Sequence, residues 1–199
     1  MELNLSRSIK RCSLGLLLAV GPVVAYVLYL LAVDNFHVVS PGQVYRSRQM
    51  SGRTLARVIP QYGIKSLLNL RGANSDQSWY RVETNTAHQF GVEHFDFALS
   101  AGREVTDGEI EKILAIIRAA PKPVLIHCQA GADRTGLVSA LYCLVIQGQP
   151  PAQADQQLTI WYGHIPWLQT IAMDHSFWRY VSNHAAPAEL NFQPQPVAP

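Results

Sequence analysis

The stretch from Val124 to Gln147 limits the possible fold of this chain more than any other part of its sequence. It begins with Val124-Leu125-Ile126-His127, which has the length and composition of a strand covered on both faces. From Gly136 to Gln147 the residues are strongly apolar and suited to a helix. A buried strand that leads directly into a helix is a unit of α/β sheets, so this stretch predicts a sheet with helices packed on it.

The same alternation of helix and strand precedes this unit. Ser51 is a suitable N-cap for one helix, which Gly63 ends, and Thr106 with Glu109 forms a capping box for another. The other expected helices cover 79–90, 152–162 and 171–181, and the other expected strands cover 64–70, 92–99 and part of 35–49. We therefore predict an α/β fold with a central, mostly parallel sheet flanked by helices on both faces.

An apolar segment precedes this predicted domain. Residues 12–33 include no charged side chain, and a helix of this length reaches roughly 33 Å, about the hydrocarbon thickness of a bilayer. A cleaved signal peptide and a buried soluble helix are the alternatives. We predict one N-terminal transmembrane helix. Because Arg7, Lys10 and Arg11 precede it, the N-terminus is expected in the cytoplasm and the domain in the periplasm, anchored to the inner membrane.

The remaining segments and the composition set further limits. We expect a short basic tail over 1–11, a single domain over 34–184 and a disordered tail over 185–199. The formal net charge of only +2 argues against a nucleic-acid partner, and no pattern indicates an oligomeric state. Cys12, Cys128 and Cys143 form neither a disulfide framework nor the paired spacing of a zinc site, so no metal is predicted.

The loop between the strand and the helix has the composition of an anion-binding site. Gly131 and Gly136 permit a sharp turn at the carboxyl end of the strand, where backbone N–H groups and the positive end of the helix can surround a phosphate. Arg134 adds a planar fork that can hold two phosphoryl oxygens at once. The predicted phosphate-binding residues are Gln129, Ala130, Gly131, Ala132, Asp133 and Arg134.

Cys128 begins this loop and is the expected nucleophile. The positive field that binds a phosphate also favours a thiolate at this position. The sulfur would attack phosphorus in line and form a phosphocysteine, while Arg134 and the loop amides hold the equatorial oxygens. Thr135 could donate its hydroxyl to the departing sulfur before water hydrolyses the intermediate. No metal or other cofactor takes part in this scheme.

The arrangement His127-Cys128, five residues, Arg134-Thr135 resembles the signature of cysteine-based protein tyrosine phosphatases. The segments 44–47 and 64–71 are similar to the entry strand and first core strand of the small dual-specificity branch, which has bacterial members. The resemblance covers roughly residues 36–163. It implies the family fold, hydrolysis of phosphomonoesters without a metal, and the roles given to Cys128 and Arg134.

One feature of the family is missing from its usual place. A carboxylic acid that protonates the leaving oxygen usually follows the strand before the last helix of the α/β run, but this chain reads Leu99-Ser100-Ala101-Gly102-Arg103 there. Glu104 and Asp107 are the nearest candidates, and Asp96 lies inside the strand. We expect Asp107 to be the acid, with a stabilising charge at the helix start as its structural alternative.

These features together predict a membrane-anchored protein tyrosine or dual-specificity phosphatase that acts on a phosphorylated protein. A phosphatase of a phospholipid or small phosphate ester is one alternative, and a phosphate-binding module with little turnover is another. Gln129, Ala132 and Asp133 add no cation to the loop, which argues against highly charged phosphates. Arg71 and Arg103 are expected either to meet substrate charge or to lie solvated on the surface.

Overall fold

The sheet of this domain has five strands and is mostly parallel. The computed structural model describes residues 18 and 20–184. Its strands are β1 (His37–Ser40), β2 (Val44–Ser47), β3 (Ser66–Asn69), β4 (Glu93–Asp96) and β5 (Val124–His127), in the spatial order β1-β2-β5-β3-β4. Only β1 is antiparallel to its neighbour. The predicted α/β sheet is confirmed, and β5 has the predicted bounds.

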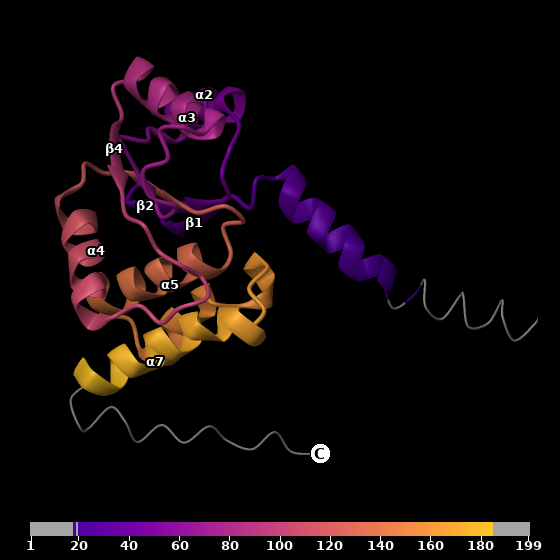
Figure 1. Cartoon of the computed structure of the whole chain (residues 1–199), viewed down its shortest axis with the longest axis vertical. Coiled ribbons are helices and arrows are strands. Elements are labelled where there is room, and N and C mark those ends of the chain that lie inside the picture. The colour runs from indigo at the N-terminus through magenta and orange to yellow at the C-terminus, as the bar shows by residue number, and fades with distance from the viewer. Residues whose placement is uncertain (1–17, 19, 185–199) are drawn as a thin grey trace, which may run out of the picture.

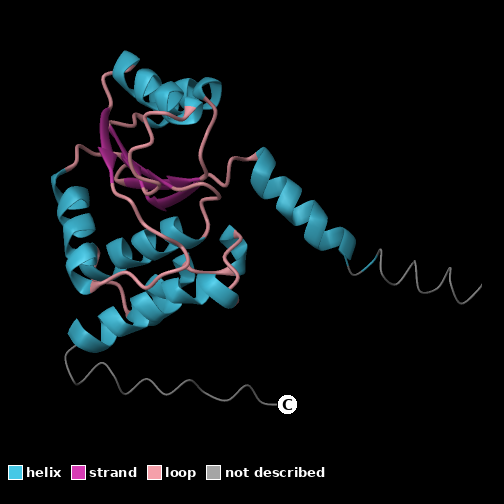
Figure 2. Ribbon diagram, viewed as in Figure 1, coloured by secondary structure: helices cyan, strands magenta, loops and turns pink. Residues whose placement is uncertain are grey.

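Helices cover both faces of the sheet (Figures 1 and 2). One face carries α2 (Gly52–Tyr62) and α3 (Ser78–Gln89), and the other carries α4 (Asp107–Ala119), α5 (Asp133–Leu141) and α7 (Ile171–His184). Leu67 and Leu125 belong to the core under α2, whereas their chain neighbours Leu68 and Ile126 belong to the core under α4, α5 and α7. The alternating direction of side chains along a strand therefore builds two cores from one sheet.

The predicted caps at Ser51 and Thr106 are confirmed, and one predicted helix is wrong. The Ser51 side chain accepts a hydrogen bond from Thr54 N at 3.1 Å, and Thr106 and Glu109 form the capping box of α4. The continuous helix predicted over 152–162 is wrong. The chain forms the short helix α6 (Pro151–Ala154) and two 3₁₀ turns, Asp155–Gln157 and Ile160–Tyr162. The Gln157 carbonyl accepts a hydrogen bond from the buried Arg46 Nη1 at 2.7 Å, so its backbone group is paired outside a helix.

The prediction of a membrane-spanning N-terminal helix is wrong for the part of the chain that the structure describes. Within residues 18 and 20–184, no helix has both the length and the apolar character that a crossing requires. The described helix over 20–32 leads into the domain. Its end packs on the domain, because Leu30 is buried and the Tyr26 hydroxyl donates to Trp161 O at 2.7 Å.

Two other expectations depend on segments at the ends of the chain. The tails expected over 1–11 and 185–199 lie outside the described residues. The periplasmic location was inferred from the charges that flank the apolar segment, and it stays a prediction.

Candidate active site

The loop that begins at Cys128 lies at the carboxyl end of the central strand. His127, the last residue of β5, is in register with Ser47 of β2 on one side and with Asn69 of β3 on the other. The chain then turns and enters α5 at Asp133. The loop is therefore placed at the end of three parallel strands, where ligands bind in open α/β sheets.

Four successive carbonyl groups of the loop accept hydrogen bonds from outside it. Gln129 O accepts from Gln49 N at 3.2 Å, and Ala130 O accepts from the Asn35 side chain at 3.0 Å. Arg46 Nη2 donates to Gly131 O at 2.9 Å and to Ala132 O at 3.3 Å. In a trans peptide the carbonyl and the following N–H point in opposite directions, so the N–H groups of the next residues are turned toward the inside of the loop.

Arg46 is the central support of this arrangement, a role that no sequence motif indicates. Its side chain is fully buried in β2, and its guanidinium lies 3.9 Å from the centre of the Tyr162 ring. Burial lowers the pKa of Arg46 to about 10, so the side chain remains charged at neutral pH. A buried cation that donates to two loop carbonyls fixes their direction more strongly than a neutral donor would.

Asn35 is a second support that sequence motifs did not indicate. It follows the helix over 20–32 and has a left-handed backbone with φ of 44°, which Asn tolerates better than most residues. Its side-chain amide donates to Tyr162 O at 2.9 Å as well as to the loop. The segment that enters the domain is thereby joined to the outer side of the phosphate loop.

Cys128 is buried within the loop, and Gly131 is placed next to it. The Gly131 amide donates to Cys128 Sγ at 3.3 Å, a contact that stabilises a thiolate. Gly131 has a φ of 73°, and a Cβ at this position would lie 2.6 Å from the backbone of Ser47 and Arg48. Only glycine fits there, so the glycine that the sequence suggested for the turn is required by both backbone conformation and space.

Arg134 and Thr135 follow at the start of α5 and complete the predicted constellation. Arg134 Nη1 donates to Leu99 O at 3.2 Å and to Leu70 O at 3.5 Å. Arg134 Nε and Thr135 Oγ1 are buried and have no hydrogen-bond partner among the described residues. Unpaired buried polar atoms are costly, and a phosphoryl oxygen and a thiolate are the groups that would pair with them. The structure thus brings Cys128, Arg134 and Thr135 together at one loop.

The strand end before the loop rests on a buried carboxylate that sequence reasoning missed. Glu83 of α3 is 3% exposed, and its Oε1 lies 3.2 Å from His127 Nε2 and 2.9 Å from His94 Nε2. Burial alone would raise the pKa of Glu83, but His127, His94 and a hydrogen bond from Gln49 outweigh burial and lower the pKa to about 2. His127 is therefore a support of the strand end, in line with its position before the loop.

The helix start after the loop rests on a buried histidine. His164 is fully buried, with Nδ1 at 2.8 Å from Asp133 Oδ1 and Nε2 at 3.0 Å from Asp174 Oδ2. Asp133 is the first residue of α5, and Asp174 belongs to α7. One imidazole therefore joins the first turn of α5 to α7. Within the described ranges, no group of three or more His, Cys, Asp or Glu residues could hold a metal ion.

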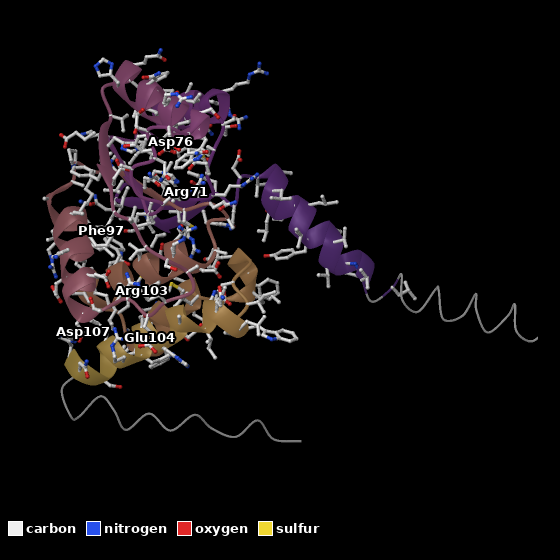
Figure 3. The ribbon with its side chains drawn as sticks, in the orientation of Figure 1. Arg71, Asp76, Phe97, Arg103, Glu104 and Asp107 are labelled. Carbon is white, nitrogen blue, oxygen red and sulfur yellow. The ribbon has the colours of Figure 1, made fainter. Side chains whose placement is uncertain are left out.

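Two of the three candidate acids lie against α7 instead of the loop. Asp107 accepts hydrogen bonds from Asn183 at 2.9 Å and from Arg179 at 3.4 Å. Glu104 pairs with Arg179 and lies 3.5 Å from His175. Figure 3 shows Glu104 and Asp107 together, well separated from Arg71 at the end of β3. The role of Asp107 as the acid stays a prediction, and its contacts favour the structural alternative.

The third candidate, Asp96, is the last residue of β4 and is also engaged elsewhere. Asn69 donates to its Oδ1 at 2.7 Å, and the Tyr80 hydroxyl donates to its Oδ2 at 2.5 Å. Burial, followed by the hydrogen bond to Asp96, raises the pKa of Tyr80 to about 12. The carboxylate of Asp96 therefore accepts hydrogen bonds from neighbours on β3 and α3, and no loop residue is among its hydrogen-bond partners in residues 20–184.

Comparisons with known proteins agree with this geometry. Residues 33–177 match the family model described as "PTP-SAK: Swiss Army Knife protein, DSP-PTPase phosphatase domain". The chain is 31% identical over 122 residues to the dual specificity protein phosphatase TpbA of Pseudomonas aeruginosa, an alignment that covers 59% of this chain and 51% of that protein. The chain thus spans about half the length of the curated relative that it matches.

Solved structures of the same relative show the same fold. The crystal structure of P. aeruginosa TpbA superposes with a TM-score of 0.61 at 24% identity, covering 74% of this chain and 86% of that one. A variant of P. aeruginosa TpbA in complex with pTyr superposes with a TM-score of 0.63 at 23% identity, covering 80% and 93%. Because the family model matches most of the chain, including the whole loop, the chain belongs to the PTP-SAK family of DSP-PTPase phosphatase domains, and the predicted class of cysteine-dependent phosphatase is confirmed.

Proposed function

We propose that this chain is a protein tyrosine and dual-specificity phosphatase, which hydrolyses phosphotyrosine and phosphoserine or phosphothreonine through a phosphocysteine. The observation that carries the proposal is the set of four loop carbonyls held outward by Gln49, Asn35 and Arg46. Their direction turns the loop amides inward around the position above Cys128. A ring of inward N–H groups over a buried sulfur suits a tetrahedral oxyanion ester.

In the first chemical step, Cys128 Sγ attacks phosphorus in line with the ester oxygen of the substrate. The S–P bond forms as the P–O bond to the substrate breaks, and the leaving oxygen takes up a proton from a carboxyl group or from water. The inward amides and Arg134 hold the three equatorial oxygens as charge moves between them. The buried, unpaired Nε of Arg134 is suited to accept one of these oxygens as a hydrogen-bond partner.

In the second step, water attacks the phosphorus of the phosphocysteine. The O–P bond forms, the S–P bond breaks, and inorganic phosphate leaves. The departing sulfur is stabilised by the Gly131 amide, which donates to it at 3.3 Å, and by the Thr135 hydroxyl, whose oxygen is buried next to the loop. The Gly131 amide already donates to the sulfur, and the unpaired Thr135 hydroxyl is the proposed second donor, so the loop and the first turn of α5 supply the leaving-group stabilisation.

Protein phosphomonoesters are the proposed substrates for two reasons. The matched relative is named a dual specificity protein phosphatase, and a structure of it is described as a complex with pTyr. The loop of this chain also carries no lysine, because the five residues between Cys128 and Arg134 are Gln129, Ala130, Gly131, Ala132 and Asp133. A loop with one arginine suits a single phosphoryl group better than a cluster of phosphates.

The test is phosphate release from phosphotyrosine, phosphoserine and phosphothreonine peptides by the full chain and two variants. Cys128→Ser removes the nucleophile and Arg134→Ala removes the phosphate fork, so both are expected to lose turnover while remaining folded. Cys143→Ser is the matched control. Burial raises the pKa of Cys143 to about 11, so this thiol stays neutral, and the variant is expected to keep wild-type turnover.

Three outcomes would overturn the proposal. One is turnover by folded Cys128→Ser above a few per cent of the wild-type value, and another is complete loss of wild-type activity in chelator. The third is hydrolysis of phospholipid vesicles or glycerol phosphate with none of the three phosphopeptides. That result would point to a phospholipid or small-ester phosphatase instead.

A further inference from the structure

Arg71 lies directly beside the phosphate loop. It follows β3, whose last residue Asn69 is in register with His127, and Asn69 Oδ1 accepts from the Arg71 backbone N–H at 2.9 Å. The residue between them, Leu70, donates its N–H to His127 O at 2.9 Å and accepts from Arg134 Nη1 at 3.5 Å. The backbone of Arg71 therefore begins one peptide away from the guanidinium that holds the phosphoryl group.

The side chain of Arg71 is held in place by neutral groups. Its guanidinium lies 3.5 Å from the centre of the Trp79 ring, and Nη1 donates to Gln49 Oε1 at 3.3 Å. Gln49 in turn touches the loop, because its N–H donates to Gln129 O. Among the described residues no carboxylate lies within ion-pair distance of Arg71. The cation is thus positioned at the loop without being neutralised.

Arg103 shows that this arrangement is not shared by the other candidate cation. Arg103 Nη2 lies 2.7 Å from Glu109 Oε1, and Nη1 lies 3.0 Å from Glu109 Oε2, so its charge is paired in bidentate fashion. Its side chain is 52% exposed. The sequence alone treated Arg71 and Arg103 alike, and the structure separates them.

An unpaired cation next to Arg134 costs free energy when no anion is bound. Burial lowers the pKa of Arg71 and the positive charge of Arg134 lowers it further, while the charges of Glu83 and Cys128 offset part of this effect. The buried carboxylate of Glu83 lies 2.9 Å from His94 and 3.2 Å from His127, and it forms no ion pair with Arg71. Such unfavourable charge placement is typical of functional sites, because a ligand of opposite charge relieves it. Arg134 and the loop amides account for the phosphoryl group, which leaves Arg71 for a second negative group.

We propose that Arg71 binds a carboxylate that flanks phosphotyrosine, so that the enzyme prefers phosphotyrosine in an acidic peptide. The inference rests on the proposed function and names its substrate class more narrowly. One planar guanidinium matches one carboxylate in a two-bond contact, whereas several phosphates would need several cations. Trp79 and Gln49 fix the guanidinium in advance, so little side-chain freedom is lost on binding.

The experiment compares phosphotyrosine peptides that carry Glu or Gln next to phosphotyrosine, on its N-terminal or its C-terminal side. Glu and Gln have the same shape, so the ratio of the two kcat/KM values reports the carboxylate charge. We expect the wild-type ratio to favour Glu by about fivefold to tenfold on at least one side. The ratio should fall toward 1 in Arg71→Leu, stay intermediate in Arg71→Lys, and remain at the wild-type value in the control Arg103→Leu.

Each ratio is measured within one protein sample, so a smaller folded fraction of a variant cancels. A wild-type ratio of 1 on both sides would overturn the proposal, as would a full Glu preference in Arg71→Leu. If the wild-type chain hydrolyses none of the peptides, the proposed function itself fails. A preference that disappears in high salt would support the charge-based explanation, because exposed ion pairs are screened.

Discussion

The two ends of the phosphate loop rest on opposite arrangements of buried charge. Before the loop, His127 and His94 share one oxygen of a single carboxylate, Glu83. After the loop, a single imidazole, His164, lies between two carboxylates, Asp133 and Asp174. The strand end is therefore organised around an acid, and the helix start is organised around a base.

This difference determines how each end responds to pH. The pKa of Glu83 is lowered to about 2, because its histidine and glutamine partners outweigh the effect of burial. Burial alone would lower the pKa of His164, but hydrogen bonds to Asp133 and Asp174 outweigh burial and raise the pKa. The first end is weakened in acid and the second in alkali, so the loop has its best support between the two.

The largest expected effect is the loss of Glu83. Glu83→Leu removes the carboxylate on which two buried histidine contacts depend, and it should lower the free energy of unfolding by about 3–5 kcal/mol. Urea unfolding at neutral pH measures this loss. Glu93→Leu is the control, because Glu93 is exposed on β4. A loss for Glu83→Leu no larger than for the control would show that the strand end does not depend on its acid.

The next largest effect should be the loss of unfolding free energy at low pH that depends on Glu83. A carboxyl group with a lowered folded pKa contributes stability above its unfolded pKa of about 4.5 and loses it as the pH falls toward about 2. Wild type should therefore lose on the order of 3 kcal/mol over this range relative to Glu83→Gln. Unfolding of both proteins at matched pH values gives the difference profile, and a flat difference would contradict the charge assigned to Glu83.

The contacts of His164 at the helix start should contribute a smaller stability, which is lost as the pH rises. His164→Leu leaves Asp133 and Asp174 without their shared partner, at a cost of about 2 kcal/mol, since both carboxylates are partly exposed. A group with a raised folded pKa contributes fully below its unfolded pKa of 6.5, and the contribution disappears as the pH rises through the folded pKa. Urea unfolding from pH 6 to 9 tests this. The control is His175→Leu, an exposed histidine on α7, and equal alkaline behaviour of both variants would contradict the assignment.

Sequence reasoning located these two ends but not what holds them. The strand Val124–His127 and the caps at Ser51 and Thr106 were predictable, because they depend on residues close together in the chain. Arg46 reaches loop carbonyls 85 and 86 positions away, because the sheet places β2 beside β5. No local pattern reports such a contact.

The buried acids and bases were also difficult to predict for a physical reason. Glu83 lies on the inward face of α3 with Thr86 and Ala87, a position that a charged residue occupies only when it is paired. Its partners come from β4 and β5, so the pairing becomes visible only once the strand order is known. The apolar segment 12–33 was wrongly predicted to span a membrane. Its hydropathy does not show that Leu30 is buried and that Tyr26 contacts the domain.

The smallest expected effect is that of Asp107→Asn. It tests whether a carboxyl group outside the phosphate loop protonates the leaving oxygen. The Asn183 hydrogen bond, with support from Arg179, lowers the pKa of Asp107, whereas a general acid must carry a proton at working pH. Asp107→Asn should therefore cost only a few tenths to about 1 kcal/mol of stability. The ratio of turnover on alkyl phosphates to turnover on esters of acidic phenols should stay at the wild-type value.

The leaving-group ratio distinguishes the remaining sources of the proton. A general acid matters for alkyl phosphates, which leave poorly, and hardly for acidic phenols, so its loss lowers the ratio by roughly 10²- to 10⁴-fold. A collapse of this size in Asp107→Asn would mean that the start of α4 approaches the loop during catalysis, and Glu104→Gln tests the neighbouring carboxylate in the same way. If only Asp133→Asn lowers the ratio by this amount, the proton comes from the Asp133 carboxyl group, which contacts His164. The start of α5 would then both stabilise the loop and protonate the leaving oxygen.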